Sequence, residues 1–397
     1  PGAGTAPNVV PLVGQGMVRA AVMGFSTAAP TDDQMSQMRR LVHQALDAGA
    51  HGLSTGLIYP PGSFTTTQEL VDVTTPVGQR GGLYFSHLRD EAGGLLASLA
   101  EAIDIGRRTG AAVQLSHLKA AGRDNWHRVP AALDLIDRAR SQGLDVTADM
   151  YPYTGGATYL AALLPRWALE GGTPGLLKRL DDPGERQRIA RDLEGAGSGI
   201  RVKVEWDKVL ISGSPDPAHS GHSIADLAAR QGQEPVAWTL DALRAASGKM
   251  GMVALLIDED NIRLQLRHPA VMVGTDSLGV SVAGPLARGI LHPRFCGTYA
   301  RIFGRYVRDE GLLSLEEASW KASGFPAQKL GLAGRGLIRE GYKADLVVLD
   351  PATVRDRATF AQPLRYPSGI DHVLVNGRLV VEAGQPVGAR PGTVLRR

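Results

Sequence analysis

The sequence predicts an α/β fold in which strands and helices alternate to build a parallel sheet, with a smaller β unit at the end. Three observations support this prediction. Between residues 8 and 153, short apolar runs alternate with amphipathic stretches of helical period, which is the pattern of βαβ units. From about Arg335 onward, strand-like runs separated by turn residues replace the helices. A length of 397 residues suits two units, or one large α/β barrel with an appended domain.

The units of this pattern can be followed along the chain. Thr31 occupies a helix N-cap position, apolar residues follow at helical spacing from Met35 to Leu46, and Gly49 ends the helix. A second helix is marked by Pro130 at a first-turn position. Six strand-like runs are expected in the parallel sheet, and they end at Gly14, Leu57, His87, His117, Asp149 and Asp276.

The rest of the sequence suggests the domain organisation. Residues 154 to 270 break the rhythm, and we interpret them as a long insertion over the sheet's carboxyl edge, with an irregular strand and two or three helices. We therefore assign residues 1–333 to the unit of the parallel sheet and its insertion. Residues 334–397 are assigned to part of a small β domain, with strands expected near 344–349 and 372–377.

Composition argues against two classes of protein. There is no apolar run of about 18 residues or more, so an integral membrane protein is not predicted. The 43 basic and 40 acidic residues give a net charge of +3 and form no long block of one sign, which argues against nucleic-acid binding. The single Cys296 cannot form an intrachain disulfide and favours a cytoplasmic location. The sequence does not indicate an oligomeric state.

Two histidines and an aspartate end strands of the predicted sheet. His87 and His117 each follow a serine at equivalent strand ends, and Asp276 closes the last strand. Because the loops after the carboxyl ends of barrel strands build the active site, these side chains are expected to converge there. Imidazoles and a carboxylate are suitable ligands for a divalent transition metal such as Zn²⁺. The sequence therefore predicts a metal site.

Other polar residues are given structural interpretations. The segment Arg89-Asp90-Glu91 is expected to form a charge cluster that does not contact substrate. His219 and His222 form a loop pair that could bind a metal. The simpler interpretation is structural, because Ser223 beside them suits the N-cap of a helix.

A series of motifs resembles one enzyme family. The motifs are Gly52 to Gly62, the two Ser-His pairs, Asp149 to Tyr153, Gly274-Thr275-Asp276-Ser277, His292-Pro293-Arg294 and the region from Pro391 to Arg397. With its motifs in this order, the chain resembles the N-acyl-D-amino-acid deacylases (D-aminoacylases) of the metal-dependent amidohydrolase superfamily. The resemblance runs from about residue 8 to the C-terminus. The resemblance implies a (β/α)8 TIM-like barrel, a β-sandwich domain made from both termini, and a hydrolytic zinc site at the barrel mouth.

The resemblance also implies roles for individual residues. His87 and His117 are zinc ligands in this interpretation, and Asp276 is the catalytic carboxylate at the metal. The substrate pocket is lined by Lys119, Tyr151 and Arg294.

The expected reaction is hydrolysis of the amide bond of an N-acyl-D-amino acid, a small-molecule substrate, to a D-amino acid and a carboxylate. Zinc with an open coordination position lowers the pKa of bound water to roughly 7 and polarises the amide carbonyl. Asp276 would take the proton of the water and hand it to the leaving amine. The guanidinium of Arg294 suits bidentate capture of the α-carboxylate, with Lys119 or Tyr151 assisting.

The sequence departs from the family pattern at its beginning. The superfamily carries a His-x-His pair on its first strand and these deacylases a Cys on the second, but this sequence has no His-x-His, and Cys296 lies elsewhere. The six strands correspond to strands three to eight of the barrel. We therefore expect a chain truncated before Pro1, with unpaired sheet edges near Val10 and Val273. Expressed alone, such a chain is expected to be poorly soluble and hydrolytically inactive.

Two alternatives stay open. One is a cyclic-amide hydrolase of the dihydroorotase or hydantoinase kind, which shares the barrel and the metal and often uses a carboxylated Lys as a metal bridge. The other is an inactive fragment of such an enzyme without competent metal binding, which the zinc content of the purified chain would reveal.

Overall fold

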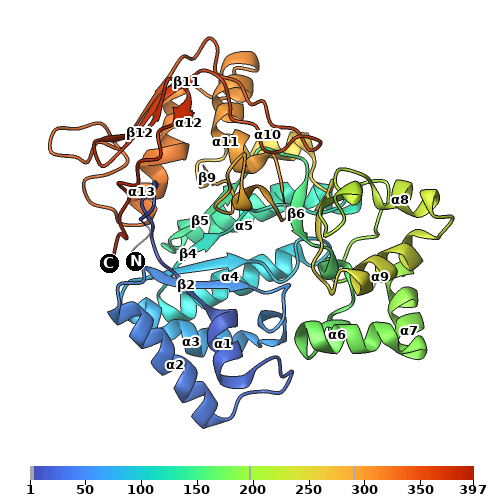
Figure 1. The fold of residues 1–397 in the computed structure, drawn as a ribbon. Helices are drawn as coiled ribbons and strands as arrows, with labels where there is room; N and C mark the ends of the chain where they lie inside the picture. The colour runs from blue at the N-terminus through green and yellow to red at the C-terminus, as the bar shows by residue number, and fades with distance from the viewer. Residues whose placement is uncertain (1–3, 196–197, 290) are drawn as a thin grey trace.

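The centre of the protein is a six-stranded parallel sheet, seen in a computed structural model that describes residues 4–195, 198–289 and 291–397 (Figure 1). Its strands lie in the order β1-β2-β3-β4-β5-β9. They are β1 (Val13–Gly14), β2 (Gly52–Gly56), β3 (Leu83–His87), β4 (Ala112–Leu115), β5 (Val146–Met150) and β9 (Val271–Val273). All six predicted strands are confirmed, with ends that differ from the predictions by at most three residues.

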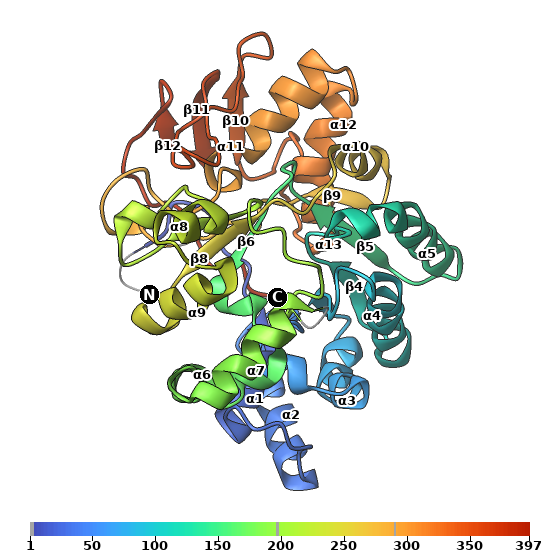
Figure 2. The same cartoon turned by 90° about the vertical axis from the view of Figure 1, so that its right-hand side faces the viewer.

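A layer of helices packs along this sheet, each helix against the next in the chain (Figure 2). These helices are α1 (Gln15–Met23), α2 (Asp32–Asp47), α3 (Thr67–Gln79), α4 (Leu95–Thr109), α5 (Val129–Ser141) and α10 (Glu259–Arg267). The predicted start of α2 is confirmed, because Thr31 and Gln34 form a capping box there. Met35, Met38 and Val42 form the buried stripe of this helix.

The main core lies between the sheet and these helices. Leu53, Tyr84, Val113 and Val271 are buried there from four different strands. Because a parallel sheet flanked by helices is shielded on its faces, its strands carry apolar residues at successive positions, as β9 does. Burial of each large apolar side chain contributes roughly 1.5–3 kcal/mol, so this core holds the strand ends in a fixed arrangement.

An inserted unit follows β5 and has a core of its own. It contains a three-stranded sheet in the order β6-β8-β7, with antiparallel pairing throughout. Its strands are β6 (Gly156–Tyr159), β7 (Val209–Gly213) and β8 (Gly251–Ala254), and its helices are α6 (Gly172–Asp181), α7 (Pro183–Glu194), α8 (Ile224–Arg230) and α9 (Pro235–Ala245). The region 154–270 thus holds more helices than the two or three expected.

The C-terminal region begins with helices and ends in a small sheet. The helices are α11 (Arg294–Arg301), α12 (Leu315–Ser319) and α13 (Phe325–Lys329), and π-helical turns at Ile302–Asp309 and Trp320–Gly324 continue α11 and α12. The antiparallel sheet consists of β10 (Leu346–Leu349), β11 (Ile370–Val375), β12 (Arg378–Glu382) and β13 (Gln385–Pro386). The two predicted strands of the small domain correspond to β10 and β11. Near the other end of the chain, Val9 bridges to Val394.

The sequence predicted that the parallel sheet has unpaired edges near Val10 and Val273. In the described part of the chain, β1 and β9 are the two end strands of the parallel sheet. The expectations that two further strands complete a barrel, and that the chain alone is inactive, stay predictions, and Pro1 lies outside the described residues. Within the same described ranges, no helix is long and apolar enough to cross a bilayer.

Candidate active site

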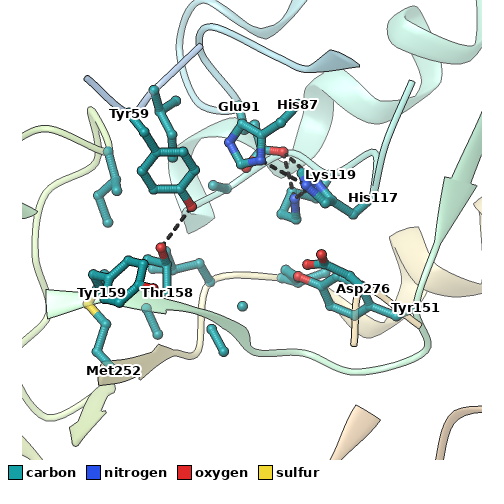
Figure 3. Close-up of a pocket in the computed structure, with 18 of the residues that line it drawn as sticks. Tyr59, His87, Glu91, His117, Lys119, Tyr151, Thr158, Tyr159, Met252 and Asp276 are labelled. Carbon is teal, nitrogen blue, oxygen red and sulfur yellow. Dashed lines mark hydrogen bonds and ion pairs between the residues drawn. The ribbon is translucent and has the colours of Figure 1, made fainter. Parts of the chain in front are cut away.

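A cavity of about 380 Å³ lies at the carboxyl ends of the parallel strands (Figure 3). The loops after β2, β3, β4, β5 and β9 supply one part of its lining, and the inserted sheet supplies another. All six residues that the sequence assigned to the site line this cavity: His87, His117, Lys119, Tyr151, Asp276 and Arg294. The structure therefore brings the whole predicted set into one pocket, while the role of each residue stays a prediction.

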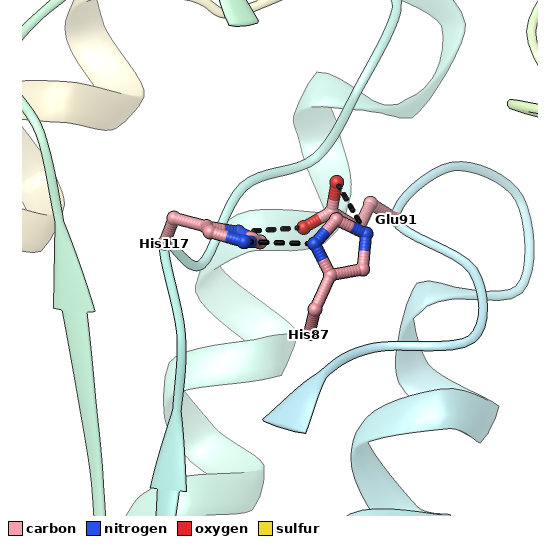
Figure 4. Close-up of side chains that lie close together, drawn as sticks. All are labelled: His87, Glu91 and His117. Carbon is pink, nitrogen blue, oxygen red and sulfur yellow. Dashed lines mark hydrogen bonds and ion pairs between the residues drawn. The ribbon is translucent and has the colours of Figure 1, made fainter. Parts of the chain in front are cut away.

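The two histidines are in direct contact (Figure 4). His87 is the last residue of β3, and its Nδ1 lies 2.8 Å from Nε2 of His117 in the loop after β4. Burial lowers the pKa of His87 to about 3, so its imidazole is neutral at pH 7. Its Nε2 is buried and has no hydrogen-bond partner within the described ranges. A buried nitrogen lone pair of this kind suits a metal ion.

The backbone of His117 is held in an uncommon conformation. Its φ of 39° lies in the left-handed region, which is rare for residues other than glycine. The side chain of Asp149 in β5 compensates, because its Oδ1 accepts a hydrogen bond from the backbone N of His117 at 2.8 Å and its Oδ2 accepts one from Gln114 at 2.7 Å. Asp276, past the end of β9, also has a positive φ, of 44°. Strained backbone of this kind often occurs at functional sites.

Glu91 is a site residue that the sequence reasoning missed. Its carboxylate lies 2.6 Å from Nζ of Lys119, 3.1 Å from Nδ1 of His117 and 3.9 Å from Nε2 of His87. Burial alone would raise the pKa of Glu91, but the ammonium of Lys119 holds it below its usual value. The carboxylate is therefore ionised. The available signal was its position in a strand-end loop, four residues after His87.

The other two residues of the expected charge cluster are held in ion pairs, and both also line the cavity. Arg89 pairs with Glu101 through two hydrogen bonds of 2.9 and 3.0 Å, and Asp90 pairs with Arg201 at 2.9 Å. Glu91 differs from them because its side chain turns toward His117 and Lys119. The expectation that the segment does not contact substrate stays a prediction.

Within the described residues, one group of His, Cys, Asp and Glu side chains could hold a metal ion: His87, Glu91 and His117. Its possible ligand atoms lie within 4.8 Å of one another. Asp276 faces the same cavity but is bound elsewhere, with its Oδ2 2.8 Å from Nη2 of Arg294. Two imidazoles beside an ionised carboxylate fit a divalent transition metal.

Arg294 forms the second charged feature of the pocket. It opens α11, is 4% exposed, and places its guanidinium 4.5 Å from the ring centroid of Tyr151. Its Nε and Nη1 are buried without hydrogen-bond partners in the described structure. The remaining nitrogen, Nη2, pairs with Asp276 at 2.8 Å, so this ion pair uses only part of the donor capacity of the guanidinium. The geometry suits an anionic ligand that accepts from the free N–H groups.

The other histidines do not join the site. His219 lies 3.5 Å from Asp216, and Ser223 caps α8 by accepting from the backbone N of Asp226, as predicted. His51 is buried and bonds to the backbone oxygens of Leu330 and Leu395.

Comparison with known proteins places the chain in a family. Residues 5–381 match the profile of the amidohydrolase family. The N-acyl-D-glutamate deacylase of Alcaligenes xylosoxydans xylosoxydans is 37% identical over 392 residues, which cover 98% of this chain and 70% of that protein. The chain belongs to the amidohydrolase family and, within it, to the N-acyl-D-amino-acid deacylases.

Solved structures show the same relationship. A crystal structure of N-acyl-D-glutamate deacylase from Bordetella bronchiseptica, complexed with zinc and a phosphonate inhibitor, has a TM-score of 0.81 and 37% identity, covering 98% of this chain and 72% of that chain. A D-aminoacylase has a TM-score of 0.81 and 34% identity, covering 100% of this chain and 73% of that chain. An L-hydantoinase from Arthrobacter aurescens is 16% identical with a TM-score of 0.50, covering 92% and 72% of the two chains, so its likeness concerns the fold alone.

Proposed function

We propose that this protein is a zinc-dependent hydrolase that cleaves N-acyl-D-amino acids to a D-amino acid and a carboxylate. One observation carries the proposal. A single cavity places a metal-compatible group, His87, Glu91 and His117, together with a buried arginine that has two free hydrogen-bond donors. The relatives named above support the substrate class. We further propose that the six-stranded sheet belongs to a (β/α)8 barrel.

In this proposal His87 and His117 would hold the zinc ion, and Asp276, which lines the same cavity and is paired with Arg294, would be the catalytic carboxylate at the metal. When bound, zinc lowers the pKa of a water ligand to roughly 7 and polarises a carbonyl group. The low pKa of His87 favours this role, because a metal ligand must present a lone pair and not a proton.

The chain's own residues bind the substrate and move the protons. The free Nε and Nη1 of Arg294 donate to the α-carboxylate, and the ammonium of Lys119 adds positive charge on the same side of the cavity. Asp276 accepts a proton from the attacking water and delivers it to the amine nitrogen. A carbon–oxygen bond forms and the carbon–nitrogen bond breaks, so that the amine leaves neutral.

Burial of Tyr151 raises its pKa, so its hydroxyl stays protonated and can donate to the same carboxylate. Its ring also packs against the guanidinium of Arg294, which limits the movement of that group.

The test measures turnover of both enantiomers of N-acetyl-methionine and N-acetyl-glutamate, together with the zinc content of the purified protein. Turnover of the D-enantiomers alone is expected. Equal or L-selective turnover would refute the proposed substrate class. Hydantoin serves as the control for a cyclic-amide hydrolase, and a chain that neither retains zinc nor hydrolyses any of these compounds would be the inactive fragment.

A further inference from the structure

Glu91 connects the two loops that carry the histidines and Lys119. It lies in the loop between β3 and α4, while His117 and Lys119 lie in the loop after β4. The same oxygen, Oε1, is 2.6 Å from Nζ of Lys119 and 3.1 Å from Nδ1 of His117. The side chain of Glu91 is 14% exposed, so these contacts are largely shielded from solvent.

The backbone fixes the position of this carboxylate independently of its ion pair. The carbonyl oxygen of Glu91 accepts a hydrogen bond from the backbone N of Ala121 at 2.6 Å, which ties the two loops together. Next to it, Oδ1 of Asp90 accepts from the backbone N of Ala92 at 2.7 Å, and Oδ2 pairs with Arg201. The loop is therefore anchored on both sides of Glu91, and the carboxylate is preorganised toward His117.

The contact with His117 determines which imidazole nitrogen can bind a metal. An ionised carboxylate can only accept, so Glu91 binds Nδ1 of His117 when that nitrogen carries hydrogen. Nε2, which faces His87, then presents a lone pair. Nζ of Lys119 lies 2.7 Å from the same Nδ1 and would favour the opposite tautomer. A cation at Nε2 selects the tautomer that Glu91 stabilises.

We infer that Glu91 is a positioning residue with two separate effects, one on the metal and one on the substrate. It orients His117 with Nε2 available to the metal, and it holds the ammonium of Lys119 in the substrate pocket. The first effect depends only on the metal, whereas the second rests on the proposed function. Carboxylate partners of metal-bound histidines typically change metal affinity by about 10- to 100-fold.

Two substitutions separate the effects. Glu91→Gln keeps an amide oxygen that can accept from Nδ1 of His117, but it removes the charge that holds Lys119. Glu91→Ala removes both. The matched control is Glu101→Gln, which removes another partly buried carboxylate from the same βα unit, one that pairs with Arg89 and does not contact His117.

The first measurement is zinc affinity by chelator competition, with no substrate present. Glu91→Ala should bind zinc about 10- to 100-fold more weakly, while Glu91→Gln and Glu101→Gln should stay near the wild type. Circular dichroism checks that each variant is folded. If Glu91→Ala does not fold, ¹⁵N NMR of zinc-loaded wild type and Glu91→Gln reports the tautomer directly, with Nδ1–H of His117 expected in both.

The second measurement is the kinetics of N-acetyl-D-amino-acid hydrolysis. Glu91→Gln should raise KM by roughly fivefold with a smaller change in kcat, since a charge-assisted contact to Lys119 is weakened. Wild-type zinc affinity in Glu91→Ala, or an Nδ1 of His117 without hydrogen, would overturn the inference. An equal loss of zinc affinity in Glu91→Gln and Glu91→Ala would also overturn it. That result would mean that the carboxylate of Glu91 is itself a metal ligand. Failure of the proposed function would remove the turnover and leave the zinc measurements interpretable.

Discussion

Arg294→Ala should reduce kcat/KM by removing the group that binds the substrate carboxylate. Arg294 is 4% exposed, and two nitrogens of its guanidinium, Nε and Nη1, have no partners in the described residues. A hydrogen bond to a charged group contributes about 1.5–3 kcal/mol, so two such bonds give an expected loss of about 3–6 kcal/mol in transition-state stabilisation. This corresponds to a fall in kcat/KM of roughly 150- to 25,000-fold.

The assay is steady-state hydrolysis of N-acetyl-D-methionine by zinc-loaded protein, with Arg294→Lys and Arg263→Ala for comparison. Lysine keeps the charge but lacks the planar fork, so Arg294→Lys should recover only part of the loss. Arg263 lies outside the cavity and pairs with Glu310 and Asp260 at the surface, where its removal should leave kinetics unchanged. An unchanged kcat/KM in Arg294→Ala would show that the carboxylate is bound elsewhere and would refute the assignment.

Three further predictions concern residues in the pocket and near it. Asp276→Asn should lower kcat by about 10²- to 10⁴-fold if the carboxylate transfers the proton, and a smaller change in kcat would exclude that role. Burial, with the nearby charge of Arg294, lowers the pKa of His292 well below its usual value. Below about pH 6.5 the unfolded chain therefore binds a proton at His292, whereas the folded chain does not. Urea unfolding of the wild type should therefore lose up to about 1.4 kcal/mol per pH unit below pH 6.5 relative to His292→Gln, whereas parallel pH profiles would contradict this. The side chains of Tyr59 and Thr158 share a hydrogen bond of 2.7 Å. A double-mutant cycle of Tyr59→Phe and Thr158→Val should therefore give a coupling of about 1 kcal/mol in the free energy of unfolding. Additive effects of the two substitutions would show that the bond does not contribute to stability.

The strands and the long helices were predictable because their patterns are local. Thr31 and its capping partner Gln34 mark the start of α2 in the sequence, and Pro130 lies in the first turn of α5. The inserted unit was harder to predict. Its sheet pairs β6 with β8, which is distant in sequence, and no local spacing encodes that antiparallel partnership.

The predicted site residues share one property that made them visible: each stands in a short motif at a strand end or at the start of a helix. Glu91 also lies in a strand-end loop, but it follows Arg89 and Asp90, and a short run of charged residues normally indicates a solvated ion-pair cluster. The distinction depends on which way each side chain turns. Arg89 reaches Glu101 on α4, whereas Glu91 turns toward His117 because its backbone carbonyl is bound to Ala121 of the neighbouring loop.

The two parts of the cavity lining differ in chemistry, and this difference limits what motifs can reveal. The strand-end loops supply charged and imidazole groups, while the inserted sheet and the segment after it supply Ala157, Met252, Ala254 and Leu256. Such residues resemble core residues in a sequence, because burial against a ligand and burial against protein favour the same apolar side chains. The reaction class can therefore be inferred from polar motifs that few other functions require. Preference for one acyl group or amino-acid side chain over another depends on the shape of the apolar wall, which is set by the packing of β6 against β8.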